Sequence, residues 1–189
     1  MAFESHELPL NRDAHICRLK ASITQIHEVY GSTVKLVDLD EDPIHPAQFL
    51  EAWSTFDNLR LQFDRQMHEV CLYAGRIWIK NLKHEDIELR ICGDLSKHIS
   101  QDREAFKMES ECEYLERLVK YEKSWTATST PSPTQIFVLS RLRKQSVVKM
   151  LDALLHWETT ALLIIGKLET HACLKTIDAH KSRMSGAYM

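Results

Sequence analysis

The sequence predicts an all-α protein, a multi-helix bundle with an extended acidic arm near residues 31–46. Its 189 residues include only five glycines and five prolines, and this scarcity of turn-forming residues favours long helices over many short strands. Hydrophobic residues make up 44% and charged residues 27% of the chain, a balance typical of a folded globular protein. Apolar residues recur at steps of three and four over long segments, as on one face of a helix.

Residues 1–30 are predicted to be an N-terminal unit that consists of one helix and the residues before it. This helix begins after Asn11, whose side chain can cap it, and ends at Tyr30, before Gly31. Its apolar residues lie on one stripe: Ile16, Leu19, Ile23, Ile26 and Tyr30.

Residues 31–46 are predicted to form the extended acidic arm. The β-branched stretch 33–37 favours an extended segment, and Pro43 and Pro46 close the region. Between them lie four acidic residues that are candidates for partner binding: Asp38, Asp40, Glu41 and Asp42. Two interpretations stay open. The arm adds a strand to the edge of a partner's sheet, or it is a solvated connector.

Residues 47–189 are predicted to form the main helical domain, and its clearest element is a long helix led by Pro46. An apolar stripe runs from Phe49 to Ile77 at steps of three and four. Because such a stripe is unstable in water, it must pack on other helices of this chain or on a partner.

Further helices are predicted in the second half of the chain. Residues 84–125 form two of them, with a break near Gly93 or Ser100, and the polar segment 126–134 is a linker.

Beyond the linker, residues 136–157 and 160–184 are both helical in pattern. Each of these two helices is predicted to break once, near residues 144–146 and near residues 170–171.

The composition argues against several functional classes. The net charge is −3 and the pI is about 6.4, whereas a protein that binds nucleic acid directly through its phosphates is normally strongly basic. The longest apolar run, residues 161–165, is far too short to cross a membrane. Five widely spaced cysteines without a Cys-x-x-Cys pair fit reduced thiols in the cytoplasm or nucleus.

No catalytic motif emerges from the residue spacing. No two glycines lie close enough for a phosphate-binding loop, and no Gly-x-Ser-x-Gly elbow or His-Glu-x-x-His pair is present. His68 and Cys71 are three residues apart on the long helix, but a buried structural cysteine is the commoner explanation for such a pair. We therefore expect no enzymatic activity, no cofactor and no metal.

The segment after Pro133 resembles the C-terminal helical region of the Gemin-two family, the partner of the survival motor neuron protein. Three elements carry the resemblance: Leu139-Ser140-Arg141-Leu142; the rhythm of Val147, Leu151, Leu154 and Trp157; and Ala161-Leu162-Leu163 followed by Leu168-Glu169. The similarity covers about 50 residues. Two departures are a shorter connection between Trp157 and Ala161 and a chain that stops soon after Met184, where the family usually continues.

The resemblance implies a scaffold of the survival motor neuron complex, which binds that protein and Sm proteins during assembly of spliceosomal ribonucleoproteins in the cytoplasm and nucleus. The helical residues that it marks for partner binding are Phe137, Arg141, Leu142, Leu151, Leu154, Trp157 and Leu162. Two alternatives remain: a non-catalytic helical subunit of another multiprotein complex, and a helical metalloenzyme that uses histidine and cysteine ligands.

Overall fold

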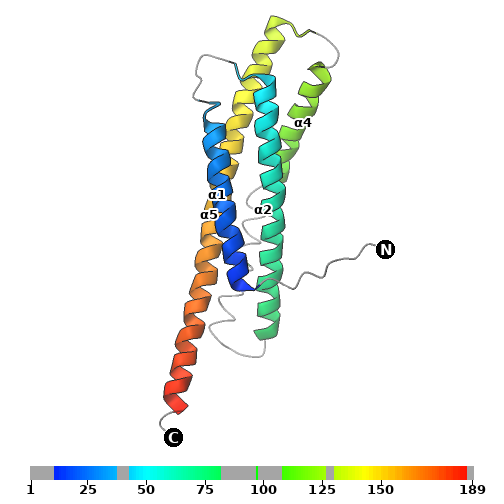
Figure 1. Cartoon of the computed structure of the whole chain (residues 1–189). Helices are drawn as coiled ribbons and strands as arrows, with labels where there is room; N and C mark the ends of the chain where they lie inside the picture. The colour runs from blue at the N-terminus through cyan, green and yellow to red at the C-terminus, as the bar shows by residue number, and fades with distance from the viewer. Residues whose placement is uncertain (1–10, 38–42, 82–96, 98–107, 127–129, 187–189) are drawn as a thin grey trace, which may run out of the picture.

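The computed structural model describes residues 11–37, 43–81, 97, 108–126 and 130–186. Its helices are α1 (Arg12–Val34), α2 (Pro46–Asn81), α4 (Met108–Thr126) and α5 (Pro133–Gly186), labelled as in Figure 1. They lie side by side in an elongated bundle, and the C-terminal part of α5 extends beyond the other helices (Figure 1). No strand occurs in these ranges, so the all-α prediction is confirmed.

Helix α1 begins where the sequence predicts and ends later. The Asn11 side chain accepts a hydrogen bond from the Ala14 backbone N–H at 2.9 Å and so caps the helix. The helix then continues through Gly31 to Val34, so the predicted end at Tyr30 is wrong.

The extended segment predicted at residues 33–37 is also wrong. Thr33 is a buried residue in the last turn of α1, and residues 35–37 form a turn in which the Leu36 N–H donates to the Thr33 carbonyl. Val34, Leu36 and Val37 pack against the core, and this burial overrides the weak strand preference of β-branched residues. The four acidic residues of the arm, at 38–42, lie outside the described residues.

The long apolar stripe of α2 is confirmed from Phe49 to Ala74, and the side chain of Ile77, its predicted last member, lies outside the described residues. Its side chains from Phe49 to Ala74 are buried at each predicted position: Phe49, Trp53, Phe56, Leu59, Phe63, Met67, Val70 and Ala74. The stripe packs on other helices of this chain, since its members join one core cluster with side chains of α1, α4 and α5.

Helix α5 is one continuous helix of 54 residues, so the predicted breaks within residues 136–184 are wrong. The polar residues that suggested a break fit inside the helix, because their hydroxyls return to the helix backbone. Ser146 Oγ donates to the Leu142 carbonyl at 2.8 Å, and Thr170 Oγ1 donates to the Gly166 carbonyl at 2.7 Å. Ser146 is also fully buried and lies among core residues.

The start of α5 is a capping box. The Gln135 N–H donates to Ser132 Oγ at 3.3 Å, and the Ser132 N–H donates to Gln135 Oε1 at 2.8 Å. Pro133 occupies the first helical position, where its missing N–H costs nothing. The linker predicted at 126–134 is therefore shorter than expected, because Thr126 belongs to α4 and Pro133 to α5.

The core is centred on Trp157 of α5. Its ring stacks on the rings of Phe56 and Phe63, with centroids 5.0 and 5.6 Å apart and interplanar angles of 20° and 23°. Helix α1 runs antiparallel to α5, as the contacts Lys20–Glu169 and His27–Glu158 show. Helices α1, α2 and α5 therefore pack together in the middle of the bundle, and α4 packs on α5 at the end where α5 begins (Figure 1).

Candidate functional site

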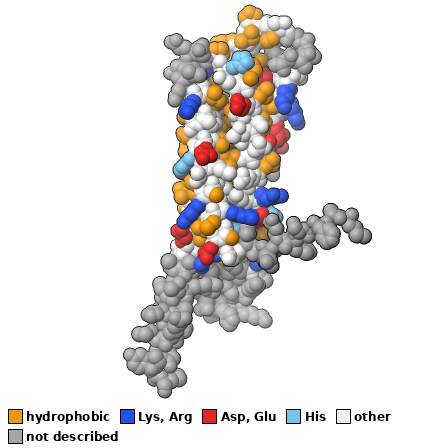
Figure 2. Space-filling view, viewed as in Figure 1, with side chains coloured by type: hydrophobic (Ala, Val, Ile, Leu, Met, Phe, Trp, Pro, Cys, Tyr) orange, Lys and Arg blue, Asp and Glu red, His pale blue; other side chains and the backbone are white. Residues whose placement is uncertain are grey.

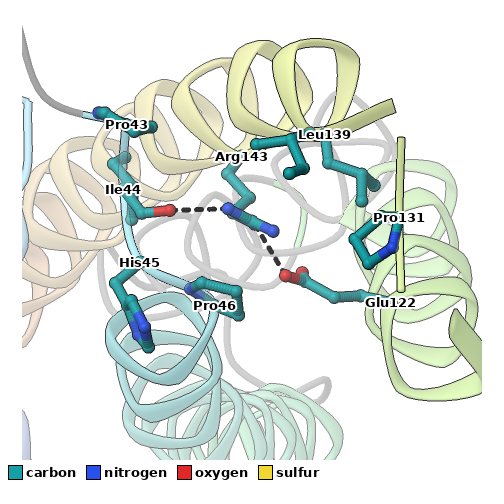
Figure 3. Close-up of a pocket in the computed structure, with 9 residues that line it drawn as sticks. Pro43, Ile44, His45, Pro46, Glu122, Pro131, Leu139 and Arg143 are labelled. Carbon is teal, nitrogen blue, oxygen red and sulfur yellow. Dashed lines mark hydrogen bonds and ion pairs between the residues drawn. The ribbon is translucent and has the colours of Figure 1, made fainter. Parts of the chain in front are cut away.

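A cavity of about 300 Å³ lies at the end of the bundle where α2 and α5 begin and α4 ends. Residues far apart in the sequence line it: Pro43, Ile44, His45, Pro46, Glu122, Pro131, Ile136, Leu139 and Arg143. Figure 3 shows Arg143 between Ile44, which precedes α2, and Glu122 of α4, with Pro131 from the segment before α5 beside Leu139. Most of the wall is apolar, and its polar side chains are His45 and the ion pair of Glu122 with Arg143.

Arg143 of α5 connects the two other chain segments of this cavity, α4 and the residues before α2. Its side chain is almost fully buried, with 5% of its surface exposed. Its Nε donates to Glu122 Oε1 of α4 at 2.6 Å, and its Nη1 donates to the Ile44 carbonyl at 2.6 Å (Figure 3). Charge-assisted bonds of this kind are stronger than neutral ones, so Arg143 holds α4 and the start of α2 against α5.

The environment of Glu122 shifts the pKa of its carboxyl group. Burial raises the pKa of the Glu122 carboxyl above its ordinary value, while the charge and the hydrogen bond of Arg143 act in the opposite direction and offset only part of this effect. Desolvation therefore disfavours the ionised form of Glu122 in its pair with Arg143.

A second candidate is a line of exposed and mostly apolar side chains along α5, which we call the outer face. It comprises Phe137, Arg141, Val148, Leu155 and Leu162. The last three are seven residues apart, which is close to two helical turns, and they stay on one side of the helix. Phe137 is the most exposed large hydrophobic side chain of the described residues, at 68%.

The outer face borders a shallow groove between α1 and α5. Ile26, Tyr30 and Leu155 form its apolar lining, and His27 and Glu158 complete it. His27 Nε2 and Glu158 Oε1 are 2.5 Å apart, so a hydrogen bond crosses the seam between the two helices. On the face seen in Figure 2, apolar side chains run along the bundle, and charges of both signs are scattered rather than gathered in one patch.

The helical residues proposed for partner binding divide into two groups. Phe137, Arg141 and Leu162 are exposed on the outer face. The others pack inward: Leu142 is half-buried against the core, and Leu151, Leu154 and Trp157 are buried in it. Burial within this chain accounts for the apolar rhythm of that second group without a partner.

Sequence reasoning missed the pair formed by Arg143 and Glu122. Both residues belong to charged stretches that resemble solvated helix faces. A signal was nevertheless present, because Arg143 falls four residues after Leu139 and four before Val147, on the buried face of α5. Glu122 is likewise seven residues after the buried Leu115 of α4.

The described residues contain no group of three histidine, cysteine or acidic side chains placed to hold a metal ion. His68 is exposed and Cys71 is half-buried beside the core. His15 is buried, and its ring centroid lies 4.9 Å from that of Tyr73. Cys17 is exposed, so His15 and Cys17 point to different sides of α1. None of the described helices has an apolar stretch long enough to cross a membrane.

Comparison with known proteins identified no relative: no protein-family model, no curated protein and no solved structure matches this chain.

Proposed function

We propose that this protein is a non-catalytic helical scaffold that binds a helix of another protein along the outer face of α5. The supporting observation is the distribution of exposed apolar side chains. Most of the large hydrophobic side chains that are exposed in the described residues belong to α5. Since isolated exposed hydrophobics are ordinary but an aligned series is not, the alignment on one helix points to an interface.

The geometry favours a helical partner. Val148 and Leu162 are 14 residues apart, which corresponds to about 21 Å along a helix. An amphipathic partner helix presents its own apolar residues at steps of three, four and seven, so it matches this spacing along its whole length. The groove beside Leu155 provides a depression for one such side chain.

The resemblance to the Gemin-two family supplies a specific candidate for the partner. In that proposal the bound helix belongs to the survival motor neuron protein, Sm proteins are further partners, and the process is assembly of spliceosomal ribonucleoproteins in the cytoplasm and nucleus. The acidic arm at residues 38–42 would then lie near the Sm proteins. A subunit of a different multiprotein complex is the alternative, and it would use the same outer face.

The test compares two surface variants of the full chain. The first carries Leu155→Ser and Leu162→Ser on the outer face, and the matched control carries Leu61→Ser and Leu72→Ser on α2, which are exposed to a similar degree. Binding to purified survival motor neuron protein and to Sm proteins is measured by titration calorimetry. The proposal expects loss of binding in the first variant alone.

Each result decides a different part of the proposal. Equal binding by both variants contradicts a role for the outer face. If the unaltered chain binds neither purified protein, the specific partner assignment is wrong. Proteins that copurify from native cells with the unaltered chain and the α2 control, but not with the outer-face variant, would then identify the other complex.

A further inference from the structure

We propose that the cavity at the end of the bundle is a binding site for a small uncharged molecule that has an apolar body and one hydrogen-bonding group. This site is separate from the outer face of α5 and does not depend on the scaffold proposal. It is formed by three chain segments, which the fold brings together around Arg143.

The walls of the cavity select an apolar body. Pro43, Pro46 and Pro131 contribute rings with little conformational freedom, so this part of the wall is pre-formed. Ile136 and Leu139 of α5 add further apolar lining. Apolar walls with a few converging polar groups are the usual make-up of a small-molecule site.

The volume sets the size of the ligand. An apolar cavity of about 150 Å³ is large enough to bind benzene. The present cavity, at about 300 Å³, is twice that size and lies at the lower end of the range for ligand pockets. A molecule with one ring or two fused rings, such as a phenol or a bicyclic ketone, fits this space.

Arg143 supplies the hydrogen-bonding group. A guanidinium carries five N–H donors in a rigid plane, and the bonds to Glu122 and to the Ile44 carbonyl use one donor each from Nε and Nη1. These two bonds fix the plane of the side chain at the edge of the cavity (Figure 3). The remaining donor capacity of Arg143 can therefore meet an acceptor atom on a ligand without further ordering of the side chain.

The charges of the cavity exclude an ionic ligand. Arg143 and Glu122 lie 2.6 Å apart and largely cancel one another. A carboxylate or an ammonium ion entering the cavity would lose its hydration without gaining an uncompensated opposite charge. An uncharged ligand avoids this penalty.

Four probes test the site on the full chain by nuclear magnetic resonance titration: 1-indanone, 4-methylphenol, toluene and benzoate. The first two carry an oxygen that can accept a hydrogen bond from Arg143, and they are expected to bind saturably and to shift the methyl resonances of Ile44 and Leu139. Toluene, which lacks the polar group, and benzoate, which is charged, are expected to bind at least about tenfold more weakly, a difference of about 1.4 kcal/mol.

Two substitutions locate the binding. Ile136→Trp places a bulky ring at the cavity wall, whereas Val138→Trp, two residues away and similarly exposed, lies outside the lining. We expect the first to weaken 1-indanone binding about tenfold or more and the second to leave it unchanged. The methyl shifts in the unaltered protein keep the test valid if either variant folds poorly.

Three results would overturn the proposal. The first is an absence of saturable binding by 1-indanone and 4-methylphenol. The second is an equal effect of the two tryptophan substitutions, which would place the probes elsewhere. The third is benzoate or toluene binding as tightly as 4-methylphenol, which would refute the assigned ligand class.

Discussion

Replacing Trp157 with alanine is expected to destabilise this protein more than any surface change on α5. The ring is 1% exposed and stacks on Phe56 and Phe63, so its removal leaves a hole between α2 and α5. A buried aromatic side chain removes about 150–250 Å² from water. At about 25 cal/mol per Å², this corresponds to about 4–6 kcal/mol.

That figure is an upper estimate, because an unfolded chain already buries part of its apolar surface. Substitutions of buried Trp or Phe by Ala cost about 3–5 kcal/mol in other cores, and we expect the same range for Trp157→Ala. Since whole domains have unfolding free energies of about 5–15 kcal/mol, the variant should be marginally folded at best.

The assay is urea unfolding followed by far-ultraviolet circular dichroism, which does not depend on tryptophan fluorescence. Leu155→Ala is the matched control, because Leu155 lies two residues earlier in α5 and is 46% exposed. The control should change the unfolding free energy by no more than about 1 kcal/mol. If Trp157→Ala and Leu155→Ala shift the midpoint equally, Trp157 is not part of a packed core, and the assignment of this face of α5 to the interior is refuted.

Three other predictions concern polar and glycine positions. Burial raises the pKa of Glu122, so this carboxyl group keeps its proton to a higher pH in the folded protein than in the unfolded chain. The stability that Glu122 contributes is therefore fully present below its ordinary pKa and is lost as the pH rises through the raised pKa. The unfolding free energy of the unaltered protein minus that of Glu122→Gln should therefore fall across this window, by about 1.4 kcal/mol for each pH unit that separates the folded and unfolded pKa values, and a difference that rises with pH would show that Arg143 dominates. Ser22→Ala should lower the unfolding free energy by about 1–3 kcal/mol, because the buried side-chain carbonyl of Gln66 loses the hydroxyl that donates to it. In a double-mutant cycle, adding Gln66→Leu should recover part of this loss, and purely additive effects would count against the bond. Gly31→Ala should raise the thermal midpoint through about 0.5–1 kcal/mol of added helix stability, because Gly31 lies inside α1 and an added Cβ meets no atom within 4 Å; a lower midpoint would mean that the end of α1 is not helical in solution.

Several features of the fold could be predicted from local signals. The stripe of α2 was predictable because its steps of three and four continue without interruption from Phe49. The start of α1 was predictable because an Asn cap acts on its own first turn. Both signals lie within one helix, and they hold whatever packs against it.

The end of α1 and the continuity of α5 could not be predicted in the same way. Gly31 and the β-branched residues after it are weak helix formers, but the preference of each is below about 1 kcal/mol, which the burial of Thr33 and its neighbours exceeds. Ser146 fits inside α5 because its hydroxyl bonds to the helix backbone and its side chain lies in the core.

The candidate sites divide in a similar way between local pattern and packing. The residue order alone shows that α5 is rich in apolar residues, and the family resemblance marked Phe137 and Leu162 together with Leu154 and Trp157 as candidates. The folded bundle was needed to separate the exposed pair from the buried pair, because burial depends on which neighbouring helix covers each side of α5. The local pattern shows only that Arg143 and Glu122 fall on the buried faces of their helices, and it gives no sign of a cavity. Its walls come from residues near 44, 122 and 143, and no pattern within one segment records that the fold brings them together.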